Sequence, residues 1–169
     1  MTSTCSEGVF VAGHFCPQGW ESLQDRCYLY VNRLLTWSAA KEICNGSSSS
    51  LVETESEEEN SFVHNMMRAH GAQVGVWLNI DDRTQEGHWV SSTTHQPLTY
   101  SKWNDGEPNN MDDEDCGMMR LPGNWNDLNC QKGDVNNAVC EKVYVAHYSL
   151  VMKLIPVTDL LLSVRRGHT

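Results

Sequence analysis

The sequence is short of positive charge. It has 12 Lys and Arg against 22 Asp and Glu, which gives a formal net charge of −10. Proteins that bind nucleic acid gather Lys and Arg against the phosphate backbone, and no basic cluster of that kind occurs here. The composition therefore argues against a nucleic-acid partner. The 169 residues are enough for one domain with a substantial core and some tail.

Two patterns typical of zinc sites are also missing. The seven cysteines form no C-x-x-C pair and the seven histidines form no H-E-x-x-H sequence. Widely spaced cysteines together with six tryptophans are typical of a disulfide-bonded, extracytosolic domain. We therefore expect a secreted or extracellular protein, although residues 1–15 show no signal-peptide pattern. In that compartment the sequon at Asn45 is an acceptor for N-glycosylation.

No uninterrupted apolar run reaches the ~18–20 residues of a membrane-spanning helix, so we expect no membrane span. The apolar segment at residues 142–169 is interrupted by Lys153, Pro156 and Asp159. Three interpretations of this tail stay open: an added strand or helix, a partner-binding segment, or an error in the assembly of the gene.

The first half of the chain contains two helical patterns. Residues 36–44, TWSAAKEIC, predict a short helix that starts at Thr36 and ends at Asn45-Gly46. A second helix is predicted after Ser56, which forms a capping box with Glu59 while acids fill the first turn. The apolar side chains of this helix are spaced for a core-facing side: Phe62, Val63, Met66 and Met67.

Short apolar pieces separated by turns dominate from Val74 onward, and they predict strands and loops. Residues 16–32 predict an additional hairpin, because Pro17 and Gly19 favour a turn ahead of the alternating Tyr28 and Tyr30. Helices early in the chain and strands late in it favour an α+β domain over an alternating parallel one.

An acidic stretch raises the question of a bound cation. Residues 105–115 hold six acids and no Lys or Arg: Asp105, Glu107, Asp112, Asp113, Glu114 and Asp115. Calcium takes about six to eight oxygen ligands from carboxylates, amides and carbonyls, and this stretch offers only those. The alternative is a solvated acidic face. The triplet Trp-Asn-Asp occurs twice nearby, at residues 103–105 and 125–127.

The chain resembles a C-type lectin carbohydrate-recognition domain. The motifs that carry the resemblance are CPQGWESLQDRCY, TWSAAKEIC, LVETESEEENSFV, VWLNIDDRTQEGHW, YSKWNDGEPNN, EDC, WNDLNC and AVCEK. They imply an α+β, C-type lectin-like fold with two helices, antiparallel sheets and a long calcium-binding loop region. The expected divisions are an N-terminal extension 1–15, a lectin domain 16–141 and a C-terminal tail 142–169.

The family's cysteine pairing implies three disulfides here: Cys16–Cys27, Cys44–Cys140 and Cys116–Cys130. Cys5 is left over, which predicts either an intermolecular disulfide or a free thiol. An oligomer linked through Cys5 or through the apolar tail is a further expectation. One motif departs from the family, because WLNI places Asn79 where the family usually has glycine, which bears on local packing.

The resemblance also implies a principal calcium site that binds sugar directly. Its expected ligands are side-chain oxygens, with the Asp127 carbonyl in addition: Glu107, Asn109, Glu114, Asn126 and Asp127. Two adjacent sugar hydroxyls would complete the coordination, with amides donating to them and carboxylates accepting from them. A second calcium site is implied at four positions: Asp82, Glu86, Asn110 and Asp115. Asn110 often corresponds to Asp in the family, which predicts weaker calcium binding.

The sequence Glu107-Pro108-Asn109 matches the family's signature for mannose-type sugars, which have equatorial 3- and 4-hydroxyls. The family holds this Glu-Pro bond cis, a geometry that proline makes accessible. The expected ligands are glycans ending in mannose, N-acetylglucosamine, glucose or fucose, and innate recognition of microbial glycans is a family-level expectation. The segment after Asn109 is one residue shorter than in familiar mannose binders, which leaves fine specificity open.

Two other functions compete with the lectin interpretation. One is a calcium-dependent surface for a protein, a mineral or ice on the same fold. The other is a glycosidase with Glu107 and Glu114 as its carboxylate pair. Ligand carboxylates have to stay ionised, whereas a general acid needs a raised pKa, so we expect no enzyme.

The two triplets are expected to differ in role. Trp125-Asn126-Asp127 is assigned to the calcium site, beside Cys130. Trp103 is expected in the core, with Asn104-Asp105-Gly106 turning the chain toward the proline. Asp112 and Asp113 receive no ligand role and are expected to be solvated.

Overall fold

The computed structural model describes residues 9–13, 16–132, 135–143 and 147–151. The chain forms two compact units. In the unit made by the two termini, β1 (Val9–Gly13) and β10 (His147–Val151) pair as an antiparallel two-stranded ribbon. The other unit, Cys16–Tyr144, holds both helices and the main sheet. Cys5 and most of the tail lie outside the described residues.

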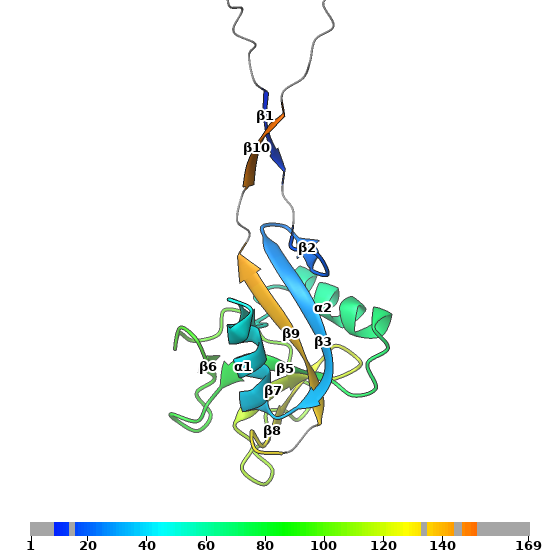
Figure 1. Cartoon of the computed structure of the whole chain (residues 1–169). Helices are drawn as coiled ribbons and strands as arrows, with labels where there is room; N and C mark the ends of the chain where they lie inside the picture. The colour runs from blue at the N-terminus through cyan, green and yellow to red at the C-terminus, as the bar shows by residue number, and fades with distance from the viewer. Residues whose placement is uncertain (1–8, 14–15, 133–134, 144–146, 152–169) are drawn as a thin grey trace, which may run out of the picture. The chain divides into compact units, whose positions relative to one another are not determined.

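A mixed sheet of eight strands forms the framework of the larger unit, and β3 and β9 are its longest strands (Figure 1). Its strands are β2 (Glu21–Leu23), β3 (Arg26–Leu35), β4 (Ser50–Leu51), β5 (Val76–Asp81), β6 (Val90–Ser91), β7 (Cys116–Met119), β8 (Trp125–Leu128) and β9 (Asn136–Val143). The order is β2-β3-β9-β5-β7-β8, with β4 on β9 and β6 on β5.

The expected α+β class is confirmed, with one refinement of the sheet. All its pairings are antiparallel except that of β5 with β9, which run parallel. Parallel neighbours need a long crossover connection. The long loop and the β7–β8 hairpin lie between these two strands in the sequence and supply it.

Helix α1 (Trp37–Gly46) begins after Thr36, as predicted, and the Thr36 side chain accepts a hydrogen bond from the Ala39 N–H at 3.2 Å. Helix α2 (Glu57–Ala69) begins after Ser56, whose Oγ accepts from the Glu59 N–H at 3.2 Å. Only this half of the predicted capping box forms. The buried Glu59 carboxylate instead accepts from the Glu55 N–H at 2.8 Å and from the Tyr28 hydroxyl at 2.5 Å, because tertiary packing brings β3 against this helix.

Two apolar clusters form the core. The predicted face of α2 supplies Val63, Met66 and Met67 to the first, while Phe62 packs at its edge. The second cluster lies under α1 and contains Trp37 and Trp77. Each large side chain removed from water contributes roughly 1.5–3 kcal/mol, so these clusters hold both helices on the sheet.

The described residues contain three disulfides, with the pairing that the resemblance implies: Cys16–Cys27, Cys44–Cys140 and Cys116–Cys130. Cys44–Cys140 joins α1 to β9 across 96 residues, a loop worth about 4.7 kcal/mol in the chain-entropy account. Cys116–Cys130 closes 14 residues around β8, worth about 3 kcal/mol on the same account.

Asn79 is accommodated in the middle of β5 without exposing its amide. The side chain is buried, and its Nδ2 donates a hydrogen bond to Thr93 Oγ1 at 2.8 Å. The backbone N–H of Asn79 donates to the Val52 carbonyl at 2.7 Å. A loop hydroxyl therefore compensates for the amide nitrogen at this family glycine position, whereas Asn79 Oδ1 is buried without a partner among the described residues.

Within the described part of the chain, neither helix combines the length and the apolarity needed to cross a bilayer. The sequon residue Asn45 is exposed near the end of α1.

Candidate calcium and sugar site

The long loop between β6 and β7 carries the acidic stretch, and its entry is built as predicted. The Glu107 N–H donates to the Asn104 carbonyl at 3.0 Å, and Gly106 has a φ of 83°, so residues 104–107 form a turn. The Glu107-Pro108 bond is cis. Asp105 is exposed on this turn.

The first Trp-Asn-Asp triplet is structural. Trp103 forms an isolated bridge with Trp125, and their rings meet edge to face at 5.6 Å. Trp103 is half-buried against the core rather than inside it, because it belongs to a loop that covers the sheet edge. The Asn104 N–H donates to the Trp125 carbonyl at 2.9 Å. The first triplet thus positions the second.

The second triplet lies on β8, where burial alternates along the strand. Trp125 points into the core and donates from Nε1 to Asn60 Oδ1 at 2.7 Å. Asp127 is also fully buried, with 0% exposure, while Asn126 is half-buried on the opposite face of the strand. A buried carboxylate requires compensation by hydrogen bonds or a cation.

The Asp127 carboxylate is only partly compensated. Its Oδ2 accepts hydrogen bonds from the backbone N–H groups of Asn109, at 2.9 Å, and Asn110, at 2.6 Å. Its Oδ1 is buried and, among the described residues, has no hydrogen-bond partner. An orphaned, buried carboxylate oxygen is costly and fits a cation-binding position.

Glu107 and Asn109 both contact the Asp127 carboxylate. Asn109 Nδ2 donates to Glu107 Oε2 at 2.5 Å. The pKa of Glu107 is raised by burial and by its contact with the Asp127 carboxylate, and Arg120 opposes that rise. Two carboxyl groups thus share a small volume, which favours either a proton or a cation between them.

Glu114 and Asn126 complete the predicted set. The pKa of Glu114 is raised by burial and by the charge of Asp127, and Lys132 opposes that rise. Asn126 Nδ2 donates to the Asp127 carbonyl, and Asn126 Oδ1 accepts from Arg120 Nη1 at 3.3 Å. Each of the five residues predicted for the principal site therefore interacts with at least one other of the five, by a hydrogen bond or by an electrostatic effect on a pKa.

The carboxylate oxygens of the predicted second site lie closer together than those of the principal site. One ligand oxygen from each of Asp82, Glu86 and Asp115 lies within 4.8 Å of the other two, whereas Glu107, Glu114 and Asp127 do not converge as a group to that extent. Asp82 Oδ2 accepts from the Gly87 N–H at 2.8 Å, and Oδ1 is buried with no partner in the described part of the chain. Each predicted site therefore contains one orphaned Asp oxygen.

The charges at this second site repel one another. Burial raises the pKa of Asp82 to about 6, with smaller contributions from Glu86 and Asp115. Asn110, the fourth predicted residue, uses its Oδ1 to accept from the Glu114 N–H at 2.8 Å. Asn110 therefore links the two sites. The carboxylates of Asp82, Glu86 and Asp115 stay grouped, and they are hard oxygen donors of the kind that calcium prefers.

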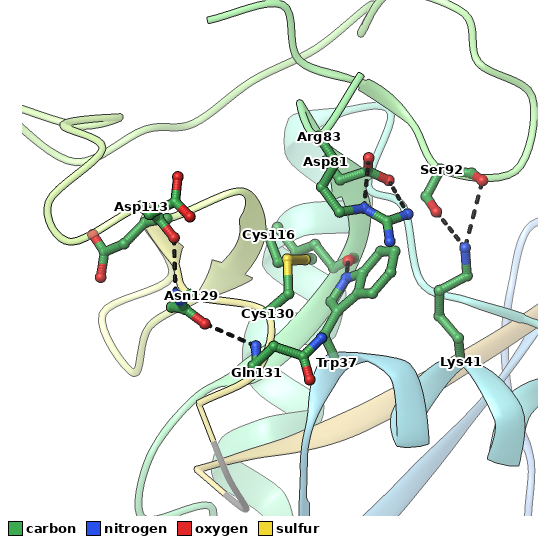
Figure 2. Close-up of a disulfide and its surroundings, with 12 residues drawn as sticks. Trp37, Lys41, Asp81, Arg83, Ser92, Asp113, Cys116, Asn129, Cys130 and Gln131 are labelled. Atoms are coloured by element: carbon green, nitrogen blue, oxygen red, sulfur yellow. Dashed lines mark hydrogen bonds and ion pairs between the residues drawn. A yellow bond between two sulfur atoms is a disulfide. The ribbon is translucent and has the colours of Figure 1, made fainter. Parts of the chain in front are cut away.

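The Cys116–Cys130 disulfide lies at the end of the acidic loop, near Asp113 and Asn129 (Figure 2). Asn129 Nδ2 donates to the Asp113 carbonyl at 3.0 Å, and the Gln131 N–H donates to Asn129 Oδ1 at 2.9 Å. Asp112 and Asp113 are exposed, as expected, and both have positive φ values.

Sequence reasoning missed Asn129 and Arg120 as site-supporting residues. Asn129 had one available signal, its position next to Cys130. Arg120 had none, since its contact with Asn126 depends on the β7–β8 hairpin.

Residues 33–142 match the Lectin C-type domain family. Human C-type lectin domain family 17, member A is 39% identical over 127 residues, which cover 75% of this chain and 32% of that relative. The fold, the disulfides and this match together define the class: the chain belongs to the C-type lectin domain family. It spans about a third of the length of this curated relative.

Solved structures agree with this assignment. The carbohydrate-recognition domain of the mouse scavenger receptor C-type lectin has a TM-score of 0.70 at 31% identity, covering 78% of this chain and 99% of that one. The domain of cow CD23, solved in the presence of a GlcNAc2Man3 oligosaccharide, has a TM-score of 0.71 at 30% identity, covering 79% and 100%. A calcium-independent type II antifreeze protein, 23% identical with a TM-score of 0.69 over 79% and 98%, shares the fold alone.

Proposed function

We propose that this protein is a calcium-dependent lectin that recognises mannose-type sugars. The observation that carries the proposal is the buried, unpartnered Oδ1 of Asp127, in a carboxylate that contacts Glu107 and is tied to Asn109 through its other oxygen. A buried carboxylate oxygen without a partner is costly, and a bound cation would compensate for it. The match to a family of carbohydrate-binding domains supports the same conclusion.

The predicted ligands would have different roles in binding calcium and sugar. Glu107, Glu114 and Asp127 supply negative charge, while Asn109 and Asn126 supply neutral amide oxygens. A bound calcium would provide open coordination positions for two vicinal sugar hydroxyls. Around those hydroxyls, Asn109 and Asn126 donate from their amides, and Glu107 and Glu114 accept. Every polar group that loses water on binding is then satisfied.

The mannose-type preference rests on the order Glu107-Pro108-Asn109. This order places the acid and the amide on the sides that suit equatorial 3- and 4-hydroxyls. The cow CD23 domain, solved with a mannose-containing oligosaccharide, supports the general substrate class. N-acetylglucosamine and glucose carry the same equatorial 3- and 4-hydroxyls, and fucose offers a vicinal equatorial pair at its 2- and 3-hydroxyls, so all three belong to the proposed set.

Asp82, Glu86, Asn110 and Asp115 would hold a second, structural calcium. Asn110 connects that site to Glu114 of the principal site, so the second ion would order the same loop. An extracellular location belongs to the same proposal, because disulfides persist in oxidising compartments. Assembly into oligomers also belongs to it, because a single sugar site gains useful avidity only in several copies. Cys5 or the apolar tail would link those copies.

A non-sugar ligand is the competing function. The calcium-independent antifreeze protein shows that this fold also occurs in a protein named for an unrelated role. A glycan array separates the two: binding to mannose-terminated glycans supports the lectin, whereas a blank array from protein with intact calcium binding supports the alternative surface.

Retention on immobilised mannose tests the proposed function. The protein should bind the resin in calcium and elute with excess chelator or free mannose, but not with galactose. Retention that persists in excess chelator would contradict the calcium-dependent mechanism, and equal elution by galactose would contradict the mannose-type preference.

A further inference from the structure

A partly apolar groove lies on the β7–β8 hairpin, with a volume of about 610 Å³. Its apolar lining comes from the hairpin and from segments on either side: Val74, Met118, Leu121, Pro122, Leu128 and Val135. Leu121 and Val74 are 40% and 37% exposed, which makes them two of the few large apolar side chains exposed in the described residues. The proposed sugar site does not use these side chains.

The groove adjoins Asn126, one expected ligand of the principal site, although none of the five expected ligands lines it. Met118, in the groove, lies directly opposite Asn126 in the antiparallel register of β7 and β8. Leu128 is two positions beyond Asn126 and therefore lies on the same face of β8. One face of this hairpin thus carries both an expected sugar ligand and two apolar groove residues.

Arg120 joins the two sites physically. It lines the groove, and its Nη1 donates to Asn126 Oδ1 at 3.3 Å. Lys132, also in the lining, acts electrostatically on Glu114. The long apolar stems of Arg and Lys can cover a nonpolar ligand while their charged ends stay in water.

The dimensions suit a small ligand rather than a folded partner. Twelve residues line the groove, whereas a stable protein interface uses about 20–30 residues on each side. Its volume falls in the range of about 300–1,000 Å³ that is usual for small-molecule sites. The contact of Arg120 with Asn126 favours, as the occupant of the groove, a group attached to a sugar at the principal site.

We propose that this groove binds the apolar aglycone of a glycoconjugate whose terminal sugar is held at the principal site. The inference rests on the proposed function and deepens it, because it names the class of molecule that carries the sugar. Burial of Leu121 and Val74 under an alkyl chain would remove exposed apolar surface from water.

Competition experiments on mannose resin test this inference. Methyl and octyl α-mannoside, both below micellar concentrations, compete for the resin in calcium. Octyl mannoside should inhibit at least about tenfold more strongly, since each methylene removed from water contributes roughly fourfold. Leu121→Ser should abolish most of that difference and leave inhibition by methyl mannoside unchanged. The matched control Leu34→Ser changes a 50%-exposed leucine outside the groove and should keep the difference.

The outcomes separate this inference from the proposed function. Equal inhibition by both glycosides overturns the groove assignment while the lectin function stands. Loss of both inhibitions in Leu121→Ser also overturns it, because Leu121 would then act on the sugar site. Absence of calcium-dependent retention on the resin overturns the proposed function and the groove assignment together.

Discussion

Asp127 Oδ2 on β8 accepts a hydrogen bond from the backbone N–H of Asn109, 2.9 Å away in the long loop and 18 residues earlier in the sequence. This bond, with the parallel one from Asn110, fixes the loop against the strand. It also directs both Asp127 oxygens to fixed places, one toward the loop backbone and one without a partner. The strand therefore serves as the rigid side of the proposed calcium site.

Sugar binding should weaken in mild acid. The pKa of Glu107 and that of Glu114 are raised by burial and by the charge of Asp127. A carboxyl group with a raised pKa takes up its proton earlier as pH falls, and a protonated carboxyl does not ligate calcium. Binding should be complete at neutral pH and decline on acidification. Resin retention measured at fixed calcium checks this, with circular dichroism showing that the fold persists. Retention undiminished at about pH 4 would contradict it.

The second site should be separable from the first. Asp82→Asn removes the charge from its buried member and should lower calcium from two ions per chain to one, as measured by equilibrium dialysis. Mannose binding at saturating calcium should survive, because the principal ligands are untouched. Asp112→Asn, which changes an exposed acid of the long loop, is the control and should keep both ions. Two ions in Asp82→Asn would refute the assignment.

The Cys116–Cys130 disulfide should matter for calcium affinity and not only for stability. Replacing both cysteines by serine costs about 3 kcal/mol on the chain-entropy account and frees the segment that Asn129 ties to Asp113. Calcium affinity should fall several-fold in titrations monitored by tryptophan fluorescence.

Replacing Cys16 and Cys27 by serine provides the comparison for that variant. This bridge spans a similar separation of 11 residues but lies outside the long loop. A similar loss of stability with unchanged calcium affinity is expected. Equal losses of calcium affinity in both variants would show that the effect is general.

Arg26 should stabilise the fold through three carboxylates. It pairs with Glu55 at 2.5 Å, Glu141 at 3.2 Å and Glu59 at 3.8 Å. Breaking a buried pair costs about 3–5 kcal/mol, and because the Arg26 side chain is 29% exposed we expect about 2 kcal/mol for Arg26→Ala. Denaturant unfolding measures it, and Arg33→Ala, an exposed arginine on the same strand, should change little.

The same cluster sets a pH dependence. The pKa of Glu141 is raised to about 8, first by burial and then by the charge of Glu59. A folded acid with a raised pKa contributes stability at low pH that is lost as pH rises through about 8. The deficit of Arg26→Ala should therefore be larger at pH 8 than at pH 5. An equal deficit at both would contradict this account of the cluster.

Local signals predicted the helices well. Thr36 and Ser56 are capping residues whose partners lie three positions away, so the sequence alone contains the whole interaction. The acidic loop and its turn at Gly106 were predictable for the same reason. The ligand assignment is implied by the resemblance to the C-type lectin family, which predicts that residues of the loop and of β8 share one site.

Partners distant in the sequence were not predictable in this way. Arg26 pairs with Glu141, 115 residues away in the sequence. The Glu59 carboxylate accepts hydrogen bonds from the Tyr28 hydroxyl and the Glu55 N–H, and does not complete the capping box. The parallel pairing of β5 with β9 and the contact of Arg120 with Asn126 likewise depend on the assembled sheet. Hydrophobic pattern and capping report what a segment forms, whereas these contacts depend on which segments meet.

The repeated Trp-Asn-Asp triplet offers a direct test of the central claim, since one chain contains a buried aspartate and its exposed counterpart. Isothermal titration of methyl α-mannoside in saturating calcium should give heat with Asp105→Ala as with the unmodified protein. It should give none with Asp127→Ala, although that variant remains folded by circular dichroism. Sugar binding retained by Asp127→Ala, or unchanged by excess chelator in the unmodified protein, would contradict calcium-mediated recognition at this site.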